Sequence, residues 1–113
     1  MPSHRPESVG KNIQIELSNI LHTETKDPRL GFVTITGVHM SHDLRTARVY
    51  ISVLGSEEDR QLTFEGLNRA NAFLRRSLGQ RLSLRHTPEL FFSYDDTLER
   101  GNRIDQLLDQ LKT

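Results

Sequence analysis

The sequence predicts an α+β fold in which helical and strand patterns follow one another in the order helix, strand, strand, helix, strand, helix. Two observations support this prediction. Apolar residues recur at helical spacing in three segments, and they alternate with polar residues in three shorter segments. The 113 residues, of which 35% are hydrophobic and 27% charged, suit one globular domain that spans residues 1–113.

The first helix is predicted from Ser8, a suitable N-cap, to about Glu24. It is recognised by apolar residues that fall on a single helical stripe: Val9, Ile13, Leu17, Ile20 and Leu21. Residues 1–7 contain two prolines and are expected to form a loose arm. Residues 26–31 are predicted to form a turn, because Pro28 disfavours helix at the residue before it.

Two strands, at 32–41 and 45–54, are expected to form an antiparallel hairpin because only a short connection separates them. In the first strand the alternation of apolar residues changes phase after Gly37, which predicts a β-bulge there. In the second strand one face is apolar, and Arg48 and Tyr50 lie on the other face.

A long helix is predicted from Ser56, a second N-cap candidate, to about Leu78. Gly79 is expected to interrupt this helix, and a short second helical piece should follow it. Pro88 precedes a third strand at 89–95, and a last helix is predicted at 96–111.

Charge is separated along this chain, although its fifteen basic and fifteen acidic side chains balance. Residues 66–88 contain no acid and five arginines: Arg69, Arg75, Arg76, Arg81 and Arg85. An acid-free, arginine-rich segment is suited to a polyanion, since each cation that reaches a phosphate releases a condensed counterion. The alternative interpretation is a helix whose arginines are simply solvated.

The candidate RNA-binding residues centre on the expected interruption at Gly79. A break there would let two helical pieces present arginines to one RNA backbone, and glycine lets the chain approach a phosphate closely. Alternatively, Gly79 is only a helix C-cap. Further candidates lie outside this segment, and each could instead be a solvated or structural charge: Arg45 and Arg48 in the hairpin, Arg29 in the turn, and Lys11 on the first helix.

The order of elements is that of a type II KH domain, but the Gly-x-x-Gly loop with which KH domains clamp RNA is missing. The chain resembles the ribosome-binding factor A family over nearly its whole length. The resemblance rests on six segments: DPRLG at 27–31, VTITGV at 33–38, SHDL at 41–44, ARVYISVLG at 47–55, AFLR at 72–75 and LRHTPEL at 84–90.

The resemblance implies a three-stranded sheet with helices on one face, and a helix kink that would fall at Ser77-Leu78-Gly79 here. It also implies binding to the free 30S ribosomal subunit and 16S rRNA, support of late 16S rRNA processing, and release aided by a ribosome-associated GTPase. A monomeric, cytoplasmic protein is expected. One alternative is a general KH-like module for single-stranded RNA, and another is a protein–protein adaptor.

Several function classes are disfavoured by the sequence. The chain has no cysteine, so disulfides and thiolate metal sites are excluded. No apolar run resembles a secretory signal or a membrane span. His39, His42 and Asp43 lie close together, but no third ligand occurs at a recognisable spacing, and no catalytic motif is present. We therefore expect no enzymatic activity, no metal and no cofactor.

Overall fold

The computed structural model describes residues 5–95. The helix predicted at 96–111 and the first four residues of the predicted arm lie outside the described residues. The described elements follow one another as the sequence predicts: α1 (Arg5–Thr23), the 3-10 helix η2 (Pro28–Phe32), β1 (Thr34–Met40), β2 (Thr46–Ser52), α2 (Glu57–Leu82) and β3 (Glu89–Tyr94).

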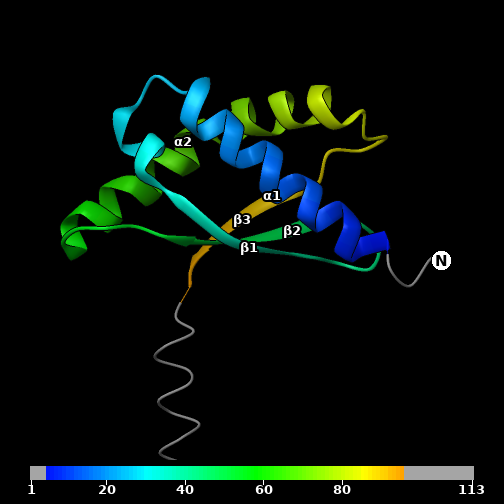
Figure 1. Ribbon diagram of the computed structural model, residues 1–113, viewed down its shortest axis with the longest axis horizontal. Coiled ribbons are helices and arrows are strands. Elements are labelled where there is room, and N and C mark those ends of the chain that lie inside the picture. Colours follow the sequence, from blue (N-terminus) through cyan, green and yellow to red (C-terminus); the bar gives the residue numbers. More distant parts are fainter. Residues whose placement is uncertain (1–4, 96–113) are drawn as a thin grey trace, which may run out of the picture.

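The three strands form one sheet in the order β1-β2-β3, which confirms the α+β class (Figure 1). β1 and β2 pair antiparallel, as expected for a hairpin, whereas β2 and β3 pair parallel because α2 carries the chain back between them. The predicted bulge is confirmed, since the register shifts between Ile35, which pairs with Ile51, and Gly37, which pairs with Tyr50.

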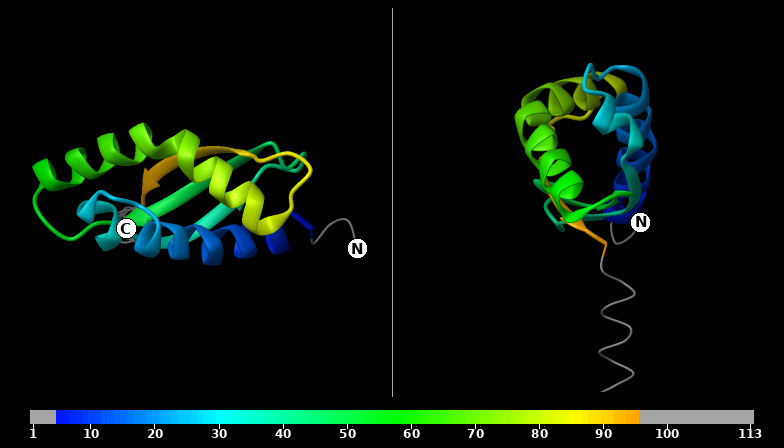
Figure 2. Two further views of the ribbon diagram at one scale, coloured as in Figure 1. Left: turned by 90° about the horizontal axis from the view of Figure 1, so that it is seen from above. Right: turned by 90° about the vertical axis from the view of Figure 1, so that its left-hand side faces the viewer.

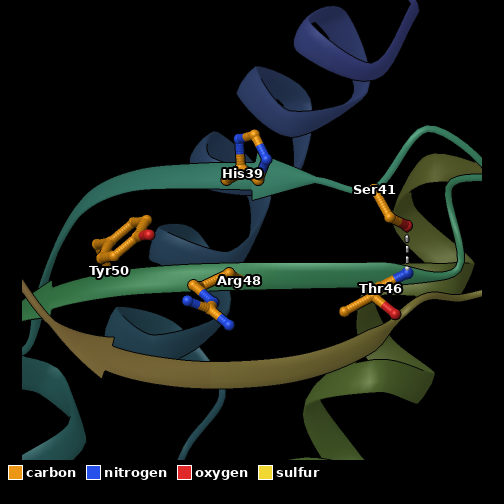
Figure 3. A pocket seen from close by; sticks show the side chains of 5 residues that line it. All are labelled: His39, Ser41, Thr46, Arg48 and Tyr50. Atoms are coloured by element: carbon orange, nitrogen blue, oxygen red, sulfur yellow. Dashed lines mark hydrogen bonds between the residues drawn. The ribbon is translucent and has the colours of Figure 1, made fainter.

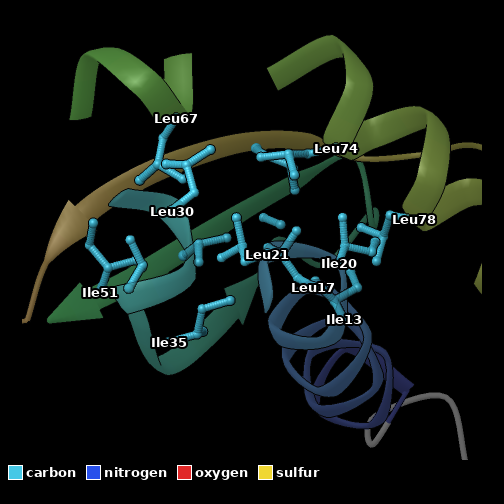
Figure 4. Close-up of a cluster of buried hydrophobic side chains, with 14 of the residues drawn as sticks. Ile13, Leu17, Ile20, Leu21, Leu30, Ile35, Ile51, Leu67, Leu74 and Leu78 are labelled. Atoms are coloured by element: carbon cyan, nitrogen blue, oxygen red, sulfur yellow. The ribbon is translucent and has the colours of Figure 1, made fainter. Parts of the chain in front are cut away.

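Both helices lie on the same face of the sheet, so the fold has two layers (Figures 1 and 2). The core fills the space between the layers, and the predicted stripe of α1 is buried there from Ile13 onward, while Val9 is only partly buried (Figure 4). The apolar face of β2 meets it, with Ala47, Val49 and Ile51 fully buried. The opposite face of the sheet is not covered by either helix, and it is called the outer sheet face below.

The predicted start of the first helix is wrong. α1 begins at Arg5, three residues before the proposed N-cap, so residues 5–7 belong to the helix and not to an arm. Pro6 is compatible with this start, because the first turn of a helix needs no N–H donor from its residues and the φ of proline is already helical.

The predicted interruption of the second helix is also wrong. α2 runs without a break through Gly79 to Leu82, and it ends where Ser83 adopts a left-handed conformation (φ 50°). Gly79 has a packing role instead, since a Cβ atom there would lie 2.5 Å from Oγ1 of Thr87. Figure 2 shows α2 changing direction near its middle, well before the end that contains Gly79.

Candidate nucleic-acid interface

The loop between β1 and β2 is held by a small set of polar contacts. The Ser41 hydroxyl donates to Oδ1 of Asp43 (2.7 Å), and the backbone N–H of Arg45 donates to the same oxygen (3.1 Å). These two bonds, the first above all, lower the pKa of the Asp43 carboxyl below its ordinary value. The N–H of Thr46 donates to Oγ of Ser41, and Leu44 takes a left-handed conformation (φ 62°). The loop therefore presents Arg45 from a fixed backbone.

A pocket of about 240 Å³ lies beside this loop, and it is called the end pocket below. Three arginines and one histidine line it, each supplied by the start of α1, the hairpin loop or the α2–β3 connection: Arg5, Arg45, Arg85 and His86. Asp43 also lines it, but its carboxylate already accepts the two hydrogen bonds described above. The end pocket thus concentrates positive charge, which suits an anion such as a phosphate.

Two of the sequence candidates, Arg45 and Arg85, meet in the end pocket although forty residues separate them in the chain. Arg5 was missed, because residues 1–7 were interpreted as an arm. As the first residue of α1 it stands at the positive end of the helix dipole, which adds to the attraction for an anion. Pro6 could have indicated the earlier start of α1, because proline is common in the first turn of a helix.

A second basic surface lies on the exposed side of α2. Arg69, Phe73 and Arg76 are spaced by four and three residues, so they form one ridge, called the α2 ridge below. Phe73 is 40% exposed. It lines a hollow of about 490 Å³ together with Arg69 and Lys26, and the acidic residues Glu24 and Asp27 border the same hollow. This ridge combines cations with an aromatic ring, a combination common in surfaces that bind single-stranded RNA.

The remaining arginines of the acid-free segment bind other parts of the protein. Nε and one terminal nitrogen of Arg75 donate to the carbonyl oxygens of Pro88 (3.1 Å) and Thr87 (3.2 Å). Arg81 of α2 forms ion pairs with two carboxylates, that of Glu16 on α1 and that of Glu24 directly after the end of α1. The Arg81 guanidinium lowers the pKa of the Glu24 carboxyl, with a smaller contribution from the hydroxyl of Ser77.

The residues of the expected kink thus serve mainly to hold the fold together. Ser77 is only 8% exposed, so its hydroxyl faces other protein groups and not solvent. Gly79 lets the α2–β3 connection pack closely against α2. That Arg75 and Arg81 contact RNA stays a prediction. Their guanidinium groups already bind other residues of this protein.

Arg48 lies on the outer sheet face, as the sequence predicts. In the strand register Arg48 pairs with His39 on β1 and with Phe91 on β3. A hollow of about 630 Å³ opens there, lined by His39, Ser41, Thr46, Arg48 and Tyr50 (Figure 3). Figure 3 shows the side chains of His39, Arg48 and Tyr50 gathered on this face.

The last two candidates are separate from the end pocket. Arg29 lies at the opposite end of the sheet, around a hollow it shares with Phe32, Leu54 and Asp59. Its positive charge contributes to the lowered pKa of Asp59, whose main cause is hydrogen bonding from Ser56. Lys11 is exposed on α1. Within residues 5–95, no three histidine, aspartate or glutamate side chains gather as metal ligands would. None of the helices described is long and apolar enough to cross a membrane.

Comparison with known proteins gives consistent results. The family model described as ribosome-binding factor A matches residues 5–108. Ribosome-binding factor A of Thioalkalivibrio sulfidiphilus is 52% identical over 106 residues, which cover 94% of this chain and 82% of that protein. A solution structure from Thermotoga maritima, described as a ribosome binding factor A, has a TM-score of 0.70 at 36% identity and covers 82% of this chain and 89% of its own.

A third match concerns a ribosomal complex. It is a homology model of Thermus thermophilus ribosome-binding factor A, fitted into a cryo-electron-microscopy map of a 30S–RbfA complex. Its TM-score is 0.62 at 27% identity, and the alignment covers 74% of this chain and 88% of that one.

Proposed function

The chain belongs to the ribosome-binding factor A family, and from this premise we propose that it binds the free 30S subunit through 16S rRNA and supports late 16S rRNA processing and subunit maturation. The observation that carries the proposal is the end pocket, where three arginines from three separate segments converge on a space that suits a phosphate. The fitted 30S–RbfA complex of Thermus thermophilus supports the choice of the 30S subunit as the partner.

The chemistry is that of a binding factor without a catalytic step. Arg5, Arg45 and Arg85 hold one stretch of RNA backbone at the end pocket, and Arg69 and Arg76 of the α2 ridge contact another. Such phosphate contacts position the protein but read no sequence. Several moderate contacts held at once produce tight binding to a folded subunit, because each raises the effective concentration of the next.

The unbroken path of α2 supports this preference for a folded subunit. KH domains grip four nucleotides of single strand with a Gly-x-x-Gly loop between two helices, and here one continuous helix occupies that place. Short RNA oligomers should therefore bind weakly and with little sequence preference. We further propose that the protein acts as a monomer in the cytoplasm, and that a ribosome-associated GTPase aids its release.

The proposal is tested by sedimentation with free 30S subunits and with joined ribosomes, at a series of salt concentrations. If four to six arginines meet phosphates, log affinity for 30S should fall with log salt at a slope of roughly −3 to −5. Co-sedimentation with free 30S and not with joined ribosomes is expected. Salt-independent binding, or equal binding to a short RNA oligomer with clear sequence preference, would overturn the proposal.

A pair of variants locates the interface. Arg45→Gln with Arg85→Gln removes two charges from the end pocket, and the salt slope should become shallower by about 1 to 2. Arg29→Gln, at the opposite end of the sheet, is the matched control and should leave the slope unchanged. If the control weakens binding as much as the double variant does, the end pocket is not the contact.

A further inference from the structure

We propose that the outer sheet face is a stacking platform for unpaired nucleotides of the RNA, an inference that rests on the proposed binding to 16S rRNA. The end pocket holds phosphates, whereas this face takes the bases themselves. The platform consists of His39 on β1, Arg48 and Tyr50 on β2, and Phe91 on β3.

The strand register places these side chains next to one another. His39 pairs with Arg48, and Arg48 pairs with Phe91, so the three form one row across the whole sheet. Directly paired residues on one face have Cβ atoms about 5 Å apart. Tyr50 lies two residues from Arg48 on the same face of β2, which extends the row into a surface (Figure 3).

Phe91 is the one large hydrophobic residue within the three described strands that is exposed. Phe91 is 51% exposed in the middle of β3, while its neighbour Leu90 is only 5% exposed and lies in the core. Both helices described lie on the other side of the sheet, and within residues 5–95 no segment covers this face (Figures 1 and 2). A large aromatic side chain held in the open beside a hollow of about 630 Å³ is suited to a flat ligand.

The chemistry of the row favours a nucleobase over an apolar protein surface. Rings and a guanidinium group offer faces on which any base can stack, and sheets that bind single-stranded RNA use aromatic side chains in this way. The other side chains of the face are short and polar: Thr34, Thr36, Thr46, Ser52 and Ser93. Among the outer positions of the three strands, the one carboxylate belongs to Glu89, beside the hairpin loop. A protein partner would need more apolar area than one exposed phenyl ring.

The platform adjoins the end pocket. The hairpin loop lines both, with Ser41 and Thr46 bordering the hollow and Asp43 and Arg45 bordering the end pocket. Arg45 and Arg48 are three residues apart, or about 10 Å along an extended strand. One stretch of RNA can therefore place a phosphate in the end pocket and neighbouring bases on the sheet.

Two anionic probes separate base stacking from charge attraction. We would titrate the isotope-labelled protein with oligouridine and with inorganic polyphosphate of matched charge, and follow the amide signals. Oligouridine should shift the signals of the end pocket together with those of His39, Arg48 and Phe91. Polyphosphate should shift the signals of the end pocket and of the α2 ridge, but not those of the outer sheet face. Oligouridine that leaves the outer face unshifted, or polyphosphate that shifts it equally, overturns the proposal.

Binding to 30S subunits provides a second measurement. Phe91→Leu keeps an apolar side chain but removes the ring, and it should lower affinity at least about 5-fold without changing the salt slope, because stacking involves no counterion release. Phe32→Leu is the matched control, since Phe32 is 78% exposed at the other end of the sheet, and it should change neither quantity. Unchanged affinity for Phe91→Leu contradicts the platform. If the wild-type protein does not bind 30S at all, the proposed function fails, and the oligouridine titration still decides the platform.

Discussion

Replacing Arg75 by glutamine should destabilise the domain, whereas the same replacement of its neighbour Arg76 should not. The half-buried guanidinium of Arg75 donates to the carbonyl oxygens of Pro88 and Thr87, at 3.1 and 3.2 Å. These bonds attach α2 to the connection that leads into β3. Arg76 is exposed on the α2 ridge, next in sequence but on another side of the helix.

The magnitude follows from the two bonds. A hydrogen bond from a charged donor contributes about 1.5–3 kcal/mol, and partial exposure of this group brings the net loss for both bonds to about 2 kcal/mol. For a domain of this size such a loss lowers the melting temperature by about 10 °C. The Arg76→Gln change touches no partner of this kind, so its effect should stay within about 0.5 kcal/mol.

Urea denaturation of the two variants and the wild type is the assay. The midpoint should move for Arg75→Gln with an unchanged m-value, which marks a change in stability and not in the unfolded state. Binding to 30S subunits should respond in the opposite way, with a shallower salt slope for Arg76→Gln. Equal stability of the two variants would refute the structural role assigned to Arg75.

Three further changes test other features. Gly79→Ala should have little effect on stability in the wild type, because the new Cβ meets Thr87 Oγ1. In a Thr87→Ala background the same change should stabilise the domain by about 1 kcal/mol. Equal effects in both backgrounds, measured by urea denaturation, would argue against the close packing of Thr87 on Gly79. Tyr94→Phe removes a buried hydroxyl without a hydrogen-bond partner among residues 5–95, so stability should hold or rise by about 1 kcal/mol, and a clear drop in the denaturation midpoint would show that the hydroxyl is bound. Arg81 lowers the pKa of Glu24, so the stabilisation from this pair is present above the ordinary pKa of 4.5 and is lost as the pH falls through the lowered value; Glu24→Gln should make the denaturation midpoint less sensitive to acid, and an unchanged acid profile would contradict this.

Local patterns in the sequence were sufficient for most of the secondary structure. The spacing of Ile13, Leu17, Ile20 and Leu21 predicted the buried stripe of α1, and the change of phase at Gly37 predicted the bulge. Both signals are read within a few residues, because the helical and strand periods repeat over that distance. The Ser56 cap was likewise confirmed, as part of a capping box with Asp59.

The behaviour of Gly79 depended on tertiary structure. A glycine disfavours a helix by only about 1 kcal/mol, and the burial of Leu74 and Leu78 on the same helix outweighs that cost. The close approach of Thr87 then makes a small residue useful at this position. No local pattern shows that a residue eight positions later will pack against it.

The division of the arginines was decided by the fold alone. The sequence indicated that residues 66–88 carry five arginines without an acid, and so predicted a basic surface. It contained no sign that Arg81 would bridge to carboxylates 57 and 65 residues away, or that Arg85 would meet Arg45 and Arg5 around one pocket. Charge composition is a property of the chain, whereas the partner of each charge depends on which distant segments the core brings together.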